Sequence, residues 1–430
     1  MRPRGSGALF RVPKDTSKPL QYWTAIVELP SHDGTRRRKV VRAKDPKVAA
    51  RKLRELQNDL EKTGDMPTAS QTLESWLRYW FSNMHTLRVR PKTAATQRGL
   101  IENHIIPAIG TIRLDKLTAQ NVRNMHQIIT SKVQEKGKNK GKPISSTTAL
   151  QAHRVLSTAL RDAEREGRIP RNVATLTDAP KRDRTHLVTL NAEDGVAILL
   201  EAAKEQNARM GSRWAAALLT GARQGELLGL EVNRVSDVLD VSWQLQRLTW
   251  AHGCDGTCGR IRGTDCHKRK LNAPADWEHR HLTGGLWLSR PKSSAGMRLV
   301  PLVEPLRSII ERRIEMAASE PNPYGLVWTA EPKRDRKTGQ PLPLDGTPID
   351  PKDDNKAWHD LLAAAGVQDA RLHDARHATV DLLYEAEVSE ADITRVVGHS
   401  TVAMSRAYRS HGNDKRLREG MSRMSQLLAH

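Results

Sequence analysis

Two imidazoles, two guanidinium groups and one phenol lie in short motifs in the second half of the chain. His373 and Arg376 are three residues apart, in Leu-His-Asp-Ala-Arg-His. His399 follows a glycine, Tyr408 lies nine residues further on, and Arg223 belongs to an earlier motif, Thr-Gly-Ala-Arg-Gln-Gly-Glu. Arginine holds non-bridging phosphate oxygens with paired hydrogen bonds and stabilises a pentacovalent transition state without a divalent ion. These residue types therefore predict a metal-free attack on a phosphodiester.

The same residues also have purely structural interpretations, and the set still needs a proton donor. His373 and Arg376 share one helix face and would pair with a carboxylate there, while Gly398 would end a helix. Tyr408 would then be an ordinary half-buried side chain. Lys292 is the candidate donor, because the motif Arg-Pro-Lys-Ser-Ser-Ala-Gly-Met-Arg is expected to form a hairpin turn between two β-prone stretches. There its compact ammonium group would reach a leaving-group oxygen.

In order and context these motifs resemble the catalytic motifs of the tyrosine recombinases, the phage-type integrases, across residues 186–430. The resemblance implies that Arg223 and Arg376 clamp the scissile phosphate and that Lys292 protonates the 5′-oxygen. It implies that Glu226 supports the helix that begins at Arg223. It also implies a mixed α/β catalytic domain of the tyrosine-recombinase type.

The resemblance gives the phenol of Tyr408 the role of nucleophile. Attack by a tyrosine forms a covalent 3′-phosphotyrosyl link and releases a 5′-hydroxyl, so strands can be rejoined without ATP or another cofactor. His373 is implied to assist the Tyr408 proton, and His399 to hydrogen-bond the phosphate. Of the five tyrosines, Tyr408 alone has the family's context, and Tyr384, on a helix after the His373 motif, is the second candidate.

The resemblance implies a site-specific DNA recombinase that integrates or excises phage or mobile-element DNA. Two alternatives remain open: a type IB topoisomerase-like enzyme that relaxes DNA, and a catalytically silent DNA-binding accessory protein. The modules at residues 1–180 favour an enzyme that selects a particular DNA site, and therefore recombination. No catalytic position is lost, which disfavours the silent accessory protein.

The positive charge of the chain is concentrated in its first 185 residues. The 430 residues carry a formal net charge of +21, from 70 Lys and Arg against 49 Asp and Glu. Residues 1–64 hold 16 basic and 7 acidic side chains, residues 65–185 hold 21 and 10, and residues 186–430 hold 33 and 32. A uniformly basic ribosomal or histone-like chain would not be divided in this way. Basic modules joined to a near-neutral catalytic module predict double-stranded DNA as the partner.

Residues 1–64 are predicted to form a small β-sheet followed by one helix. β-prone runs lie between residues 20 and 44, and Asp45 is a candidate N-cap for a helix that ends at Gly64. By layout and charge this module resembles the arm-site DNA-binding domain of integrases. Its candidate phosphate contacts, which would otherwise form a solvated strand edge, are Arg36, Arg37, Arg38 and Lys39.

Residues 68–180 are predicted to form an all-helical basic module that resembles the core-site DNA-binding domain of the same family. An apolar stripe at helical spacing opens it, from Leu73 to Phe81. Further helices are expected near residues 93–106, 118–130 and 146–166. A lysine-rich loop supplies two candidate DNA contacts, Lys138 and Lys140, with a flexible solvated loop as the alternative. The whole chain is thus predicted to be mainly α-helical with small β-sheets, an α+β protein of several domains.

Targeting signals and partners follow from the same sequence. No apolar run approaches the roughly 18 residues of a membrane span, and the N-terminus lacks the apolar core of a signal peptide. We therefore expect a soluble protein with no membrane partner, in the cytoplasm of a bacterial host at the nucleoid. The resemblance implies a homotetramer on paired attachment sites of core and arm type, with a directionality factor and a DNA-bending host protein as candidate partners. The amphipathic tail after Asp414 would either fold back or dock on a neighbouring subunit.

An apparent insertion at about residues 251–284 separates two β-prone stretches and contains all three cysteines. Cys254, Cys258 and Cys266, with the adjacent His267, would make a Cys₃His structural zinc site. The spacing is not that of a standard zinc finger, and the adjacency of Cys266 and His267 strains a tetrahedral site, so a reduced metal-free loop is an equal alternative. Zinc would fasten the insertion and take no part in strand cleavage.

Overall fold

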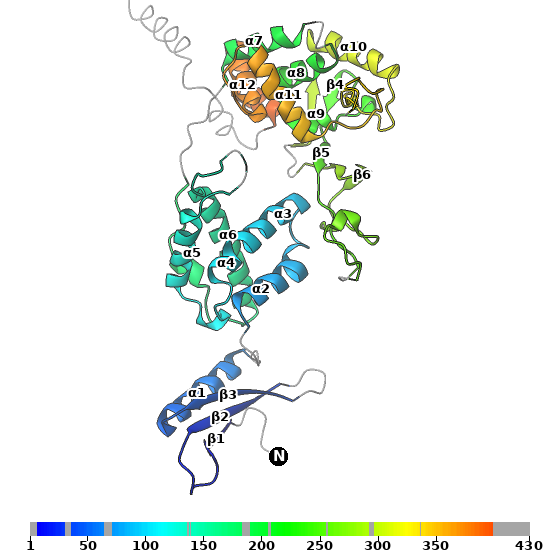
Figure 1. Cartoon of the computed structure of the whole chain (residues 1–430). Coiled ribbons are helices and arrows are strands. Elements are labelled where there is room, and N and C mark those ends of the chain that lie inside the picture. The colour runs from blue at the N-terminus through cyan, green and yellow to red at the C-terminus, as the bar shows by residue number, and fades with distance from the viewer. Residues whose placement is uncertain are drawn as a thin grey trace, which may run out of the picture. The chain divides into compact units, whose positions relative to one another are not determined.

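The structure is a computed structural model that describes residues 7–30, 36–63, 71–135, 137, 139–182, 190–204, 208–254, 257–291, 296–335 and 337–398. The chain divides into two compact units, Met1–Arg184 and Thr185–His430, and each is described by itself (Figure 1). Helices dominate the described parts of both units, with three small sheets among them, which confirms the expected α+β class. No helix in the described ranges is long and apolar enough to cross a membrane.

Three antiparallel strands and one helix form the first module of unit 1. They are β1 (Gly7–Val12), β2 (Tyr22–Leu29), β3 (Arg37–Ala43) and α1 (Pro46–Thr63). Strand β2 lies in the middle of the sheet, and β3 forms one edge. Leu53 of α1 packs against Val27 and Leu29 of β2, so that the helix covers one face of the sheet.

The start of α1 follows the prediction, whereas β1 does not. The Asp45 carboxylate accepts hydrogen bonds from the main-chain N–H groups of Lys47 and Val48, at 2.7 and 3.1 Å, which confirms the predicted N-cap. Strand β1 lies outside the predicted β-prone runs. It is a strand because it pairs along its whole length with β2, and its local sequence does not predict that pairing.

Helices form the second module of unit 1 around one apolar core. They are α2 (Leu73–Trp80), α3 (Pro91–Leu100), α4 (Ile106–Ile109), α5 (Ala119–Ser131) and α6 (Ser146–Arg165), with π-helical turns at Phe81–His85 and Ile101–Ile105 and 3₁₀ turns at Leu114–Lys116 and Val173–Leu176. The predicted stripe is the centre of this core, because Trp76, Leu77 and Trp80 have no exposed surface. The Trp80 indole N–H also donates to the buried Asp162 carboxylate of α6, at 2.8 Å. The helix predicted at 93–106 runs as α3, a π-helical turn and α4.

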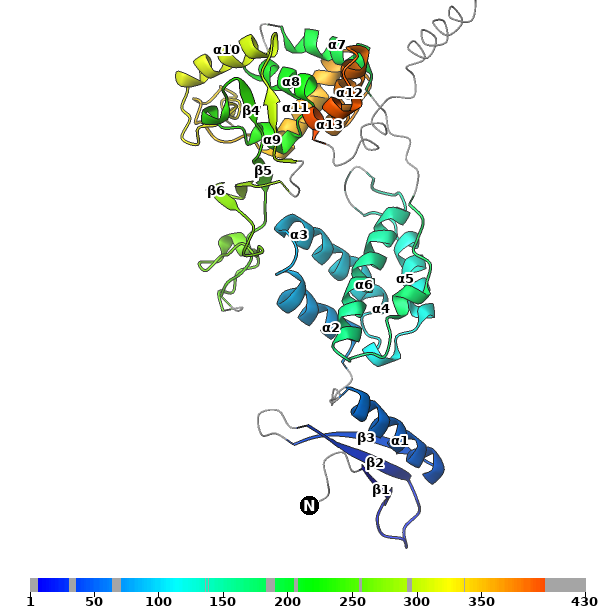
Figure 2. The ribbon, with the colours of Figure 1, turned by 180° about the vertical axis from the view of Figure 1, so that it is seen from behind.

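Unit 2 is built from helices that pack around α8. They are α7 (Ala192–Ala202), α8 (Ala208–Thr220), α9 (Gln224–Leu228), α10 (Leu306–Ala318), α11 (Pro351–Ala364), α12 (Ala375–Glu385) and α13 (Glu390–Val397). Helices α7, α10 and α12 pack against α8, and α13 lies next to α12 (Figure 2). Trp214 of α8 meets Trp358 of α11 in the core, with ring centroids 5.6 Å apart. The buried Arg213 pairs with the buried Asp354 at 2.9 Å, which ties the same two helices together.

Two small antiparallel sheets accompany these helices. Strand β4 (Val238–Asp240) pairs with β8 (Leu299–Pro301), and a second sheet has the order β5 (Gln244–Arg247), β7 (Leu286–Ser289), β6 (His279–Thr283). The expected hairpin around Lys292 is therefore wrong, because the strands before and after it belong to different sheets. The reason is that β7 already pairs with β5 on one edge and β6 on the other, which leaves no edge for β8.

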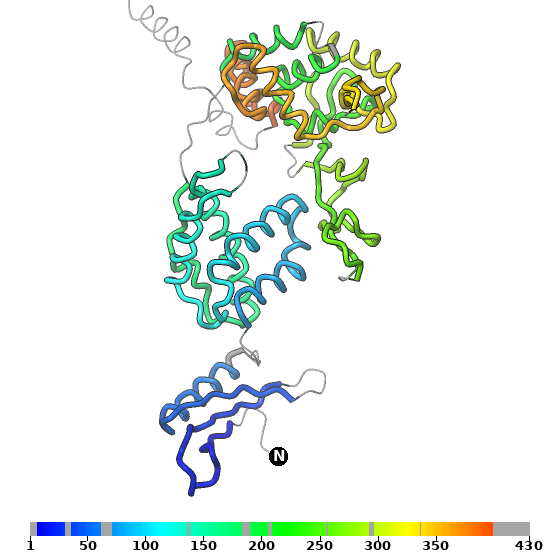
Figure 3. The backbone as a smooth tube through the Cα atoms, viewed as in Figure 1, coloured from blue at the N-terminus to red at the C-terminus, as the bar shows by residue number. Residues whose placement is uncertain are grey.

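The loop between β5 and β6, residues 248–278, is called the insertion below. It is shorter than the predicted segment 251–284, because β6 belongs to the sheet. It extends from the sheet away from the helices of unit 2 (Figure 3). The main chains of Ala251 and Lys270 exchange hydrogen bonds of 2.8 and 2.9 Å, which join its two arms. Leu248 and Trp277 pack with Trp287 of β7 in a small buried cluster at its base.

Candidate active site

Arg223 stands at the start of α9, immediately after the turn that ends α8, which confirms that an arginine lies where a helix begins. Its main-chain N–H donates to the Glu226 carboxylate at 2.8 Å and fixes the first turn of α9. Gly221 in the turn has φ +58, a left-handed conformation that favours glycine, and a Cβ there would lie 3.2 Å from Thr379. The Thr379 hydroxyl of α12 donates to the Leu218 carbonyl at 2.8 Å. The turn that carries Arg223 is thus packed directly on α12.

Arg376 lies in the first turn of α12 and is buried, with 2% of its surface exposed. One terminal nitrogen donates to the Gly221 carbonyl, and the other donates to the Val397 carbonyl at 2.7 Å. Arg223 donates to the carbonyl of the next residue, Gly398, at 3.2 Å. Gly398 ends α13 with φ 71, which is the predicted helix end. The two guanidinium groups therefore converge on the C-terminus of α13, where the helix dipole attracts positive charge.

Glu226 connects this pair to a third arginine. Its carboxylate accepts from Arg223 at 2.8 Å and from Arg298 at 3.0 Å, and only 1% of the residue is exposed. Arg298 also donates to the Val396 carbonyl at 2.7 Å. Burial favours a higher pKa for Glu226, but the positive charges of Arg298 and Arg223 outweigh it and lower this pKa, so the carboxylate stays ionised. Arg223, Glu226, Arg298 and Arg376 are called the arginine cluster below.

Arg298 is the member of this cluster that the sequence analysis missed. The only signal was its place in the Lys292 motif, just before β8. Nothing local distinguishes it from a surface arginine, because its partners Glu226 and Val396 are 72 and 98 residues away along the chain. Its role in holding Glu226 follows from the tertiary structure alone.

His373 lies in a short 3₁₀ turn directly before α12. The neighbouring Asp374 carboxylate accepts hydrogen bonds from the main chain and the side chain of Arg371, which fixes this turn. The pKa of His373 is lowered to about 4, first because surrounding protein atoms displace water from part of the ring. The positive charges of Arg376 and Arg223 lower it further. His373 is therefore a neutral imidazole at pH 7, close enough to both arginines to sense their charge.

Some predicted site residues lie outside the described residues: Lys138, Lys292, His399 and Tyr408. Lys140, the other candidate in the lysine-rich loop, is described and exposed. The second candidate nucleophile, Tyr384, is also described. It is 4% exposed, and its hydroxyl donates to the Glu390 carboxylate at 3.3 Å. A phenol held in this way serves the packing of α12 against α13.

The four basic residues at the start of β3 divide between the two faces of the sheet, because side chains alternate along a strand. The side chains of Arg37 and Lys39 lie on the face of the sheet that α1 covers, and both residues are half-buried. Arg38 is exposed on the opposite face, which no helix of the described module covers. Arg36 precedes the strand, is exposed and forms an ion pair with Glu28. Of the four, Arg38 is therefore the best placed for a contact on the open face.

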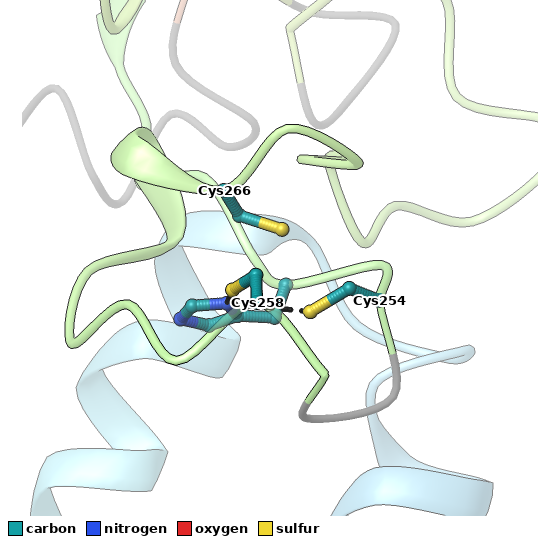
Figure 4. A group of neighbouring side chains, drawn as sticks. Cys254, Cys258 and Cys266 are labelled. Carbon is teal, nitrogen blue, oxygen red and sulfur yellow. Dashed lines mark hydrogen bonds between the residues drawn. The ribbon is translucent and has the colours of Figure 1, made fainter.

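The cysteines of the insertion and one histidine form a second polar group in unit 2. The ligand atoms of His252, Cys254, Cys258 and Cys266 all lie within 4.8 Å of one another, and these residues are called the cysteine cluster below (Figure 4). The predicted fourth member, His267, is wrong, and His252 takes its place. The physical reason is that Cys266 has an extended main chain, with φ −77 and ψ 127, on which neighbouring side chains point to opposite sides.

Comparisons with known protein families identify the class of enzyme to which this fold belongs. The model of the phage integrase N-terminal SAM-like domain matches residues 72–129, and that of the phage integrase family matches residues 274–415. An integrase from Saccharopolyspora erythraea is 31% identical over 413 residues, which cover 90% of each chain. The chain therefore belongs to the phage integrase family, the tyrosine recombinases, and is a site-specific recombinase.

Solved structures of integrases share this fold. The Tn1549 transposon integrase in complex with a circular intermediate DNA has a TM-score of 0.56 at 18% identity, over 83% of this chain and 100% of that one. A lambda integrase dimer bound to a COC′ core site has a TM-score of 0.51 at 17% identity, over 80% and 97% of the two chains. A lambda integrase tetramer bound to a Holliday junction has a TM-score of 0.50 at 16% identity, over 90% and 92%. At these identities the likeness concerns the fold.

Proposed function

We propose that this recombinase cuts and rejoins DNA through a covalent bond between Tyr408 and the 3′-phosphate of the cut strand. The observation that carries the proposal is the convergence of Arg223 and Arg376 on the C-terminus of α13. The chain that follows this point carries His399 and then Tyr408. A guanidinium group has five N–H donors in a planar fork, an arrangement that suits paired hydrogen bonds to phosphate oxygens.

In the proposed reaction the Tyr408 oxygen attacks phosphorus and the bond to the 5′-oxygen breaks. The 5′-oxygen leaves with a proton from the Lys292 ammonium, and the tyrosine proton passes to His373. The lowered pKa of His373 keeps the imidazole in its proton-accepting form before DNA binds. An incoming phosphate anion raises that pKa and makes the ring a better base. The reverse sequence rejoins the strand, and it needs neither a metal ion nor a nucleotide cofactor.

Charge stabilisation by the arginine cluster is the main source of rate enhancement in this proposal. Three guanidinium groups and one carboxylate leave two positive charges, which match the charge that develops on the phosphoryl oxygens. Arg223 and Arg376 would contact these oxygens, with a further hydrogen bond from His399. Glu226 and Arg298 are positioning residues, because the Glu226 carboxylate bonds the Arg223 side chain and Arg298 bonds that carboxylate in turn.

The DNA would be held by the two modules of unit 1 as well as by unit 2. We assign residues 1–64 to arm-type sites and residues 68–180 to core-type sites, with residues 186–430 as the catalytic domain. The excess of positive charge in residues 1–185 supports this assignment. Arg38 on the open sheet face and Lys140 in the exposed loop are the described residues that fit phosphate contacts best.

The proposed biological reaction is the integration or excision of phage or mobile-element DNA in a bacterial cell. The solved relatives with this fold include a transposon integrase and a tetrameric lambda integrase, which supports a mobile element and a homotetramer on paired sites. A directionality factor and a DNA-bending host protein are the expected partners. The bacterial cytoplasm, at the nucleoid, is the expected location.

A nicked suicide substrate that carries the attachment site tests the proposed chemistry. The unaltered protein should accumulate a covalent protein–DNA adduct, because the nick lets the 5′-fragment diffuse away. Tyr408→Phe should bind the same DNA and form no adduct. Tyr384→Phe is the matched control, since it removes a phenol that is buried in the core, and it should keep adduct formation.

The outcome also separates the alternatives. An adduct from Tyr408→Phe would contradict the assigned nucleophile, and absence of any adduct from the unaltered protein would indicate a silent DNA-binding protein. Product topology then distinguishes strand exchange between two sites from relaxation of one supercoiled circle.

A further inference from the structure

The cysteine cluster is unrelated to the proposed strand chemistry, and its geometry matches a metal ion. The three cysteines are free thiols whose side chains turn toward one common space (Figure 4). Nδ1 of His252 lies 3.3 Å from Sγ of Cys258 and 3.9 Å from Sγ of Cys254. A tetrahedral zinc ion has bonds of about 2.3 Å to sulfur and about 2.0 Å to nitrogen, which places a sulfur ligand and a nitrogen ligand roughly 3.5 Å apart. The observed distances lie on either side of that value.

We propose that His252, Cys254, Cys258 and Cys266 bind one structural zinc ion that fastens the insertion. Four protein ligands fill a tetrahedral coordination shell and leave no position for water or substrate, which is the mark of a structural zinc site. Thiolate sulfur and imidazole nitrogen favour zinc over magnesium or calcium, which prefer oxygen. The ion binds as the three thiols lose their protons.

Hydrogen-bonded turns hold the main chain that carries the cysteines. The Cys254 carbonyl accepts from the main-chain N–H and from the hydroxyl of Thr257, at 3.0 and 2.7 Å. The Cys266 main-chain N–H donates to the Gly263 carbonyl, and the Cys266 carbonyl accepts from the N–H of Arg269, both at 3.1 Å. Outer contacts that fix the position of a ligand are typical of metal sites.

His252 is oriented in the way that a metal ligand requires. Its Nδ1 faces Sγ of Cys254 and Sγ of Cys258. An imidazole nitrogen that faces thiol sulfur atoms can join them as a ligand of the same ion. His267 is exposed and has no place in the group, so the two histidines make a matched pair for an experiment.

The insertion has little else to hold its outer part together. The apolar cluster at its base involves Leu248 and Trp277, while Ile261 in the outer part is 99% exposed. Gly253 and Gly263 pack so closely that a Cβ would lie 2.3 and 2.1 Å from main-chain carbonyl oxygens. Small segments that cannot build an apolar core commonly depend on a metal or disulfides for a fixed structure.

Nearby positive charge balances the site. Zinc with three thiolates and a neutral imidazole carries one net negative charge. The chain between Cys258 and Lys270 supplies compensating cations, namely Arg260, Arg262, Lys268, Arg269 and Lys270. The Arg269 guanidinium stacks on the Trp250 ring at 4.8 Å, which ties the segment after Cys266 to the first arm of the insertion.

The test is the zinc content of the full-length protein, purified in reducing buffer without chelator, together with cobalt substitution. We expect one zinc per chain and, after exchange, the cobalt absorption bands of a tetrahedral thiolate site. His252→Ala and Cys254→Ser should lose most of the bound metal, whereas His267→Ala should keep one zinc per chain. Circular dichroism of each variant checks that the helices of both units are retained.

A second measurement does not depend on the variants. Removal of zinc by a chelator should speed trypsin cleavage at Arg260 and Arg262 by about tenfold or more, since local opening then exposes the outer loop, and added zinc should reverse the effect. Protein that neither contains zinc nor takes up added zinc would overturn the proposal. Equal metal loss from His267→Ala would overturn the ligand assignment, and a disulfide among the three cysteines in reducing buffer would replace the zinc site with a redox bridge.

Discussion

The arginine cluster and the cysteine cluster are both groups of polar side chains in unit 2, but the chain holds them in different ways. The arginine cluster draws its members from α9, α12 and the segment before β8, and its arginines bond main-chain carbonyls or the shared Glu226 carboxylate. The cysteine cluster lies within the 15 residues from His252 to Cys266 and has no opposite charge among its members. A site that leaves two positive charges is completed by an anion, and a site of three thiols is completed by a cation.

This comparison teaches that burial alone does not decide what holds a polar site together. Glu226 and Arg298 are 1% and 7% exposed at their side chains and neutralise each other without an added ion. Cys254 and Cys266 are each 3% exposed, and no carboxylate or arginine among the described residues is hydrogen-bonded to them. The first site is therefore a product of the tertiary fold, and the second is expected to need its ligand.

Replacement of Arg376 by lysine should have the largest effect. Lysine keeps the charge but cannot bond the Gly221 and Val397 carbonyls and a phosphate from one planar group. We expect the rate of strand cleavage to fall about 10²–10³-fold, the size of effect seen when one transition-state donor is removed. Single-turnover cleavage of the suicide substrate measures it. Arg395→Lys, at an exposed position on α13, is the control and should cleave at the normal rate. Equal cleavage rates for the two variants would show that Arg376 takes no part in the reaction.

Replacement of Glu226 by glutamine should cost the most stability. The change leaves the buried Arg298 without its carboxylate, and breaking a buried ion pair costs about 3–5 kcal/mol. The matched control is Glu278→Gln, because Glu278 pairs with Arg290 at the surface, where a pair contributes about 0–1 kcal/mol. Urea unfolding of the two variants gives both values. If both variants lost a similar free energy of unfolding, the buried ion pair of the arginine cluster would contribute no more to stability than the surface pair of Glu278 and Arg290.

Two glycine substitutions should separate the clusters by what they disturb. In Gly221→Ala the alanine must adopt the left-handed φ of this position, and its Cβ presses against Thr379. The free energy of unfolding of unit 2 should fall by about 1–2 kcal/mol. Gly253→Ala drives a Cβ into the Lys268 carbonyl, which should weaken zinc binding about 10–100-fold while unfolding changes little. Urea unfolding and zinc titration, each applied to both variants, test this. The reverse pattern would contradict the division between a fold-held and an ion-held site.

The smallest expected effect is a difference between two histidines with lowered pKa values. Burial of the ring lowers the pKa of both His373 and His126, the latter in the helical module, to about 4. The charges of Arg376 and Arg223 lower that of His373 further, and His153 lowers that of His126. A bound phosphate should raise the pKa of His373 by about one to two pH units and leave that of His126 unchanged. NMR titration with and without DNA measures both, and a shift at His126 alone would contradict the proposed site.

The lowered pKa of His126 also decides in which direction the stability of the protein changes with pH. His126 binds a proton less readily in the folded than in the unfolded chain, so its contribution is complete above about pH 6.5 and is lost as the pH falls toward 4. His126→Gln should therefore flatten the fall of stability across this range. Urea midpoints measured at several pH values compare the two proteins, and an unchanged slope would indicate that other groups dominate.

Local patterns predicted the helices of unit 1 and the N-terminal cap of α1. The stripe that contains Trp76 and Trp80 is buried as expected, and Asp45 caps α1, because periodicity and capping depend on residues within one or two turns. Strands β1 and β6 and the separation of β7 from β8 were not predicted. A strand is defined by its neighbours in a sheet, and these neighbours lie elsewhere in the chain.

For the sites, the sequence by itself predicted the chemistry and the tertiary structure decided the partners. Residue types and motif order singled out Arg223, Arg376 and Tyr408 as candidates, because a phosphodiester reaction admits few functional groups. Only the fold shows that Arg298 completes the arginine cluster across 72 residues, and that His252 replaces His267 beside the cysteines. The physical reason is direction: a sequence gives the spacing of side chains, whereas main-chain conformation decides which of them face one another.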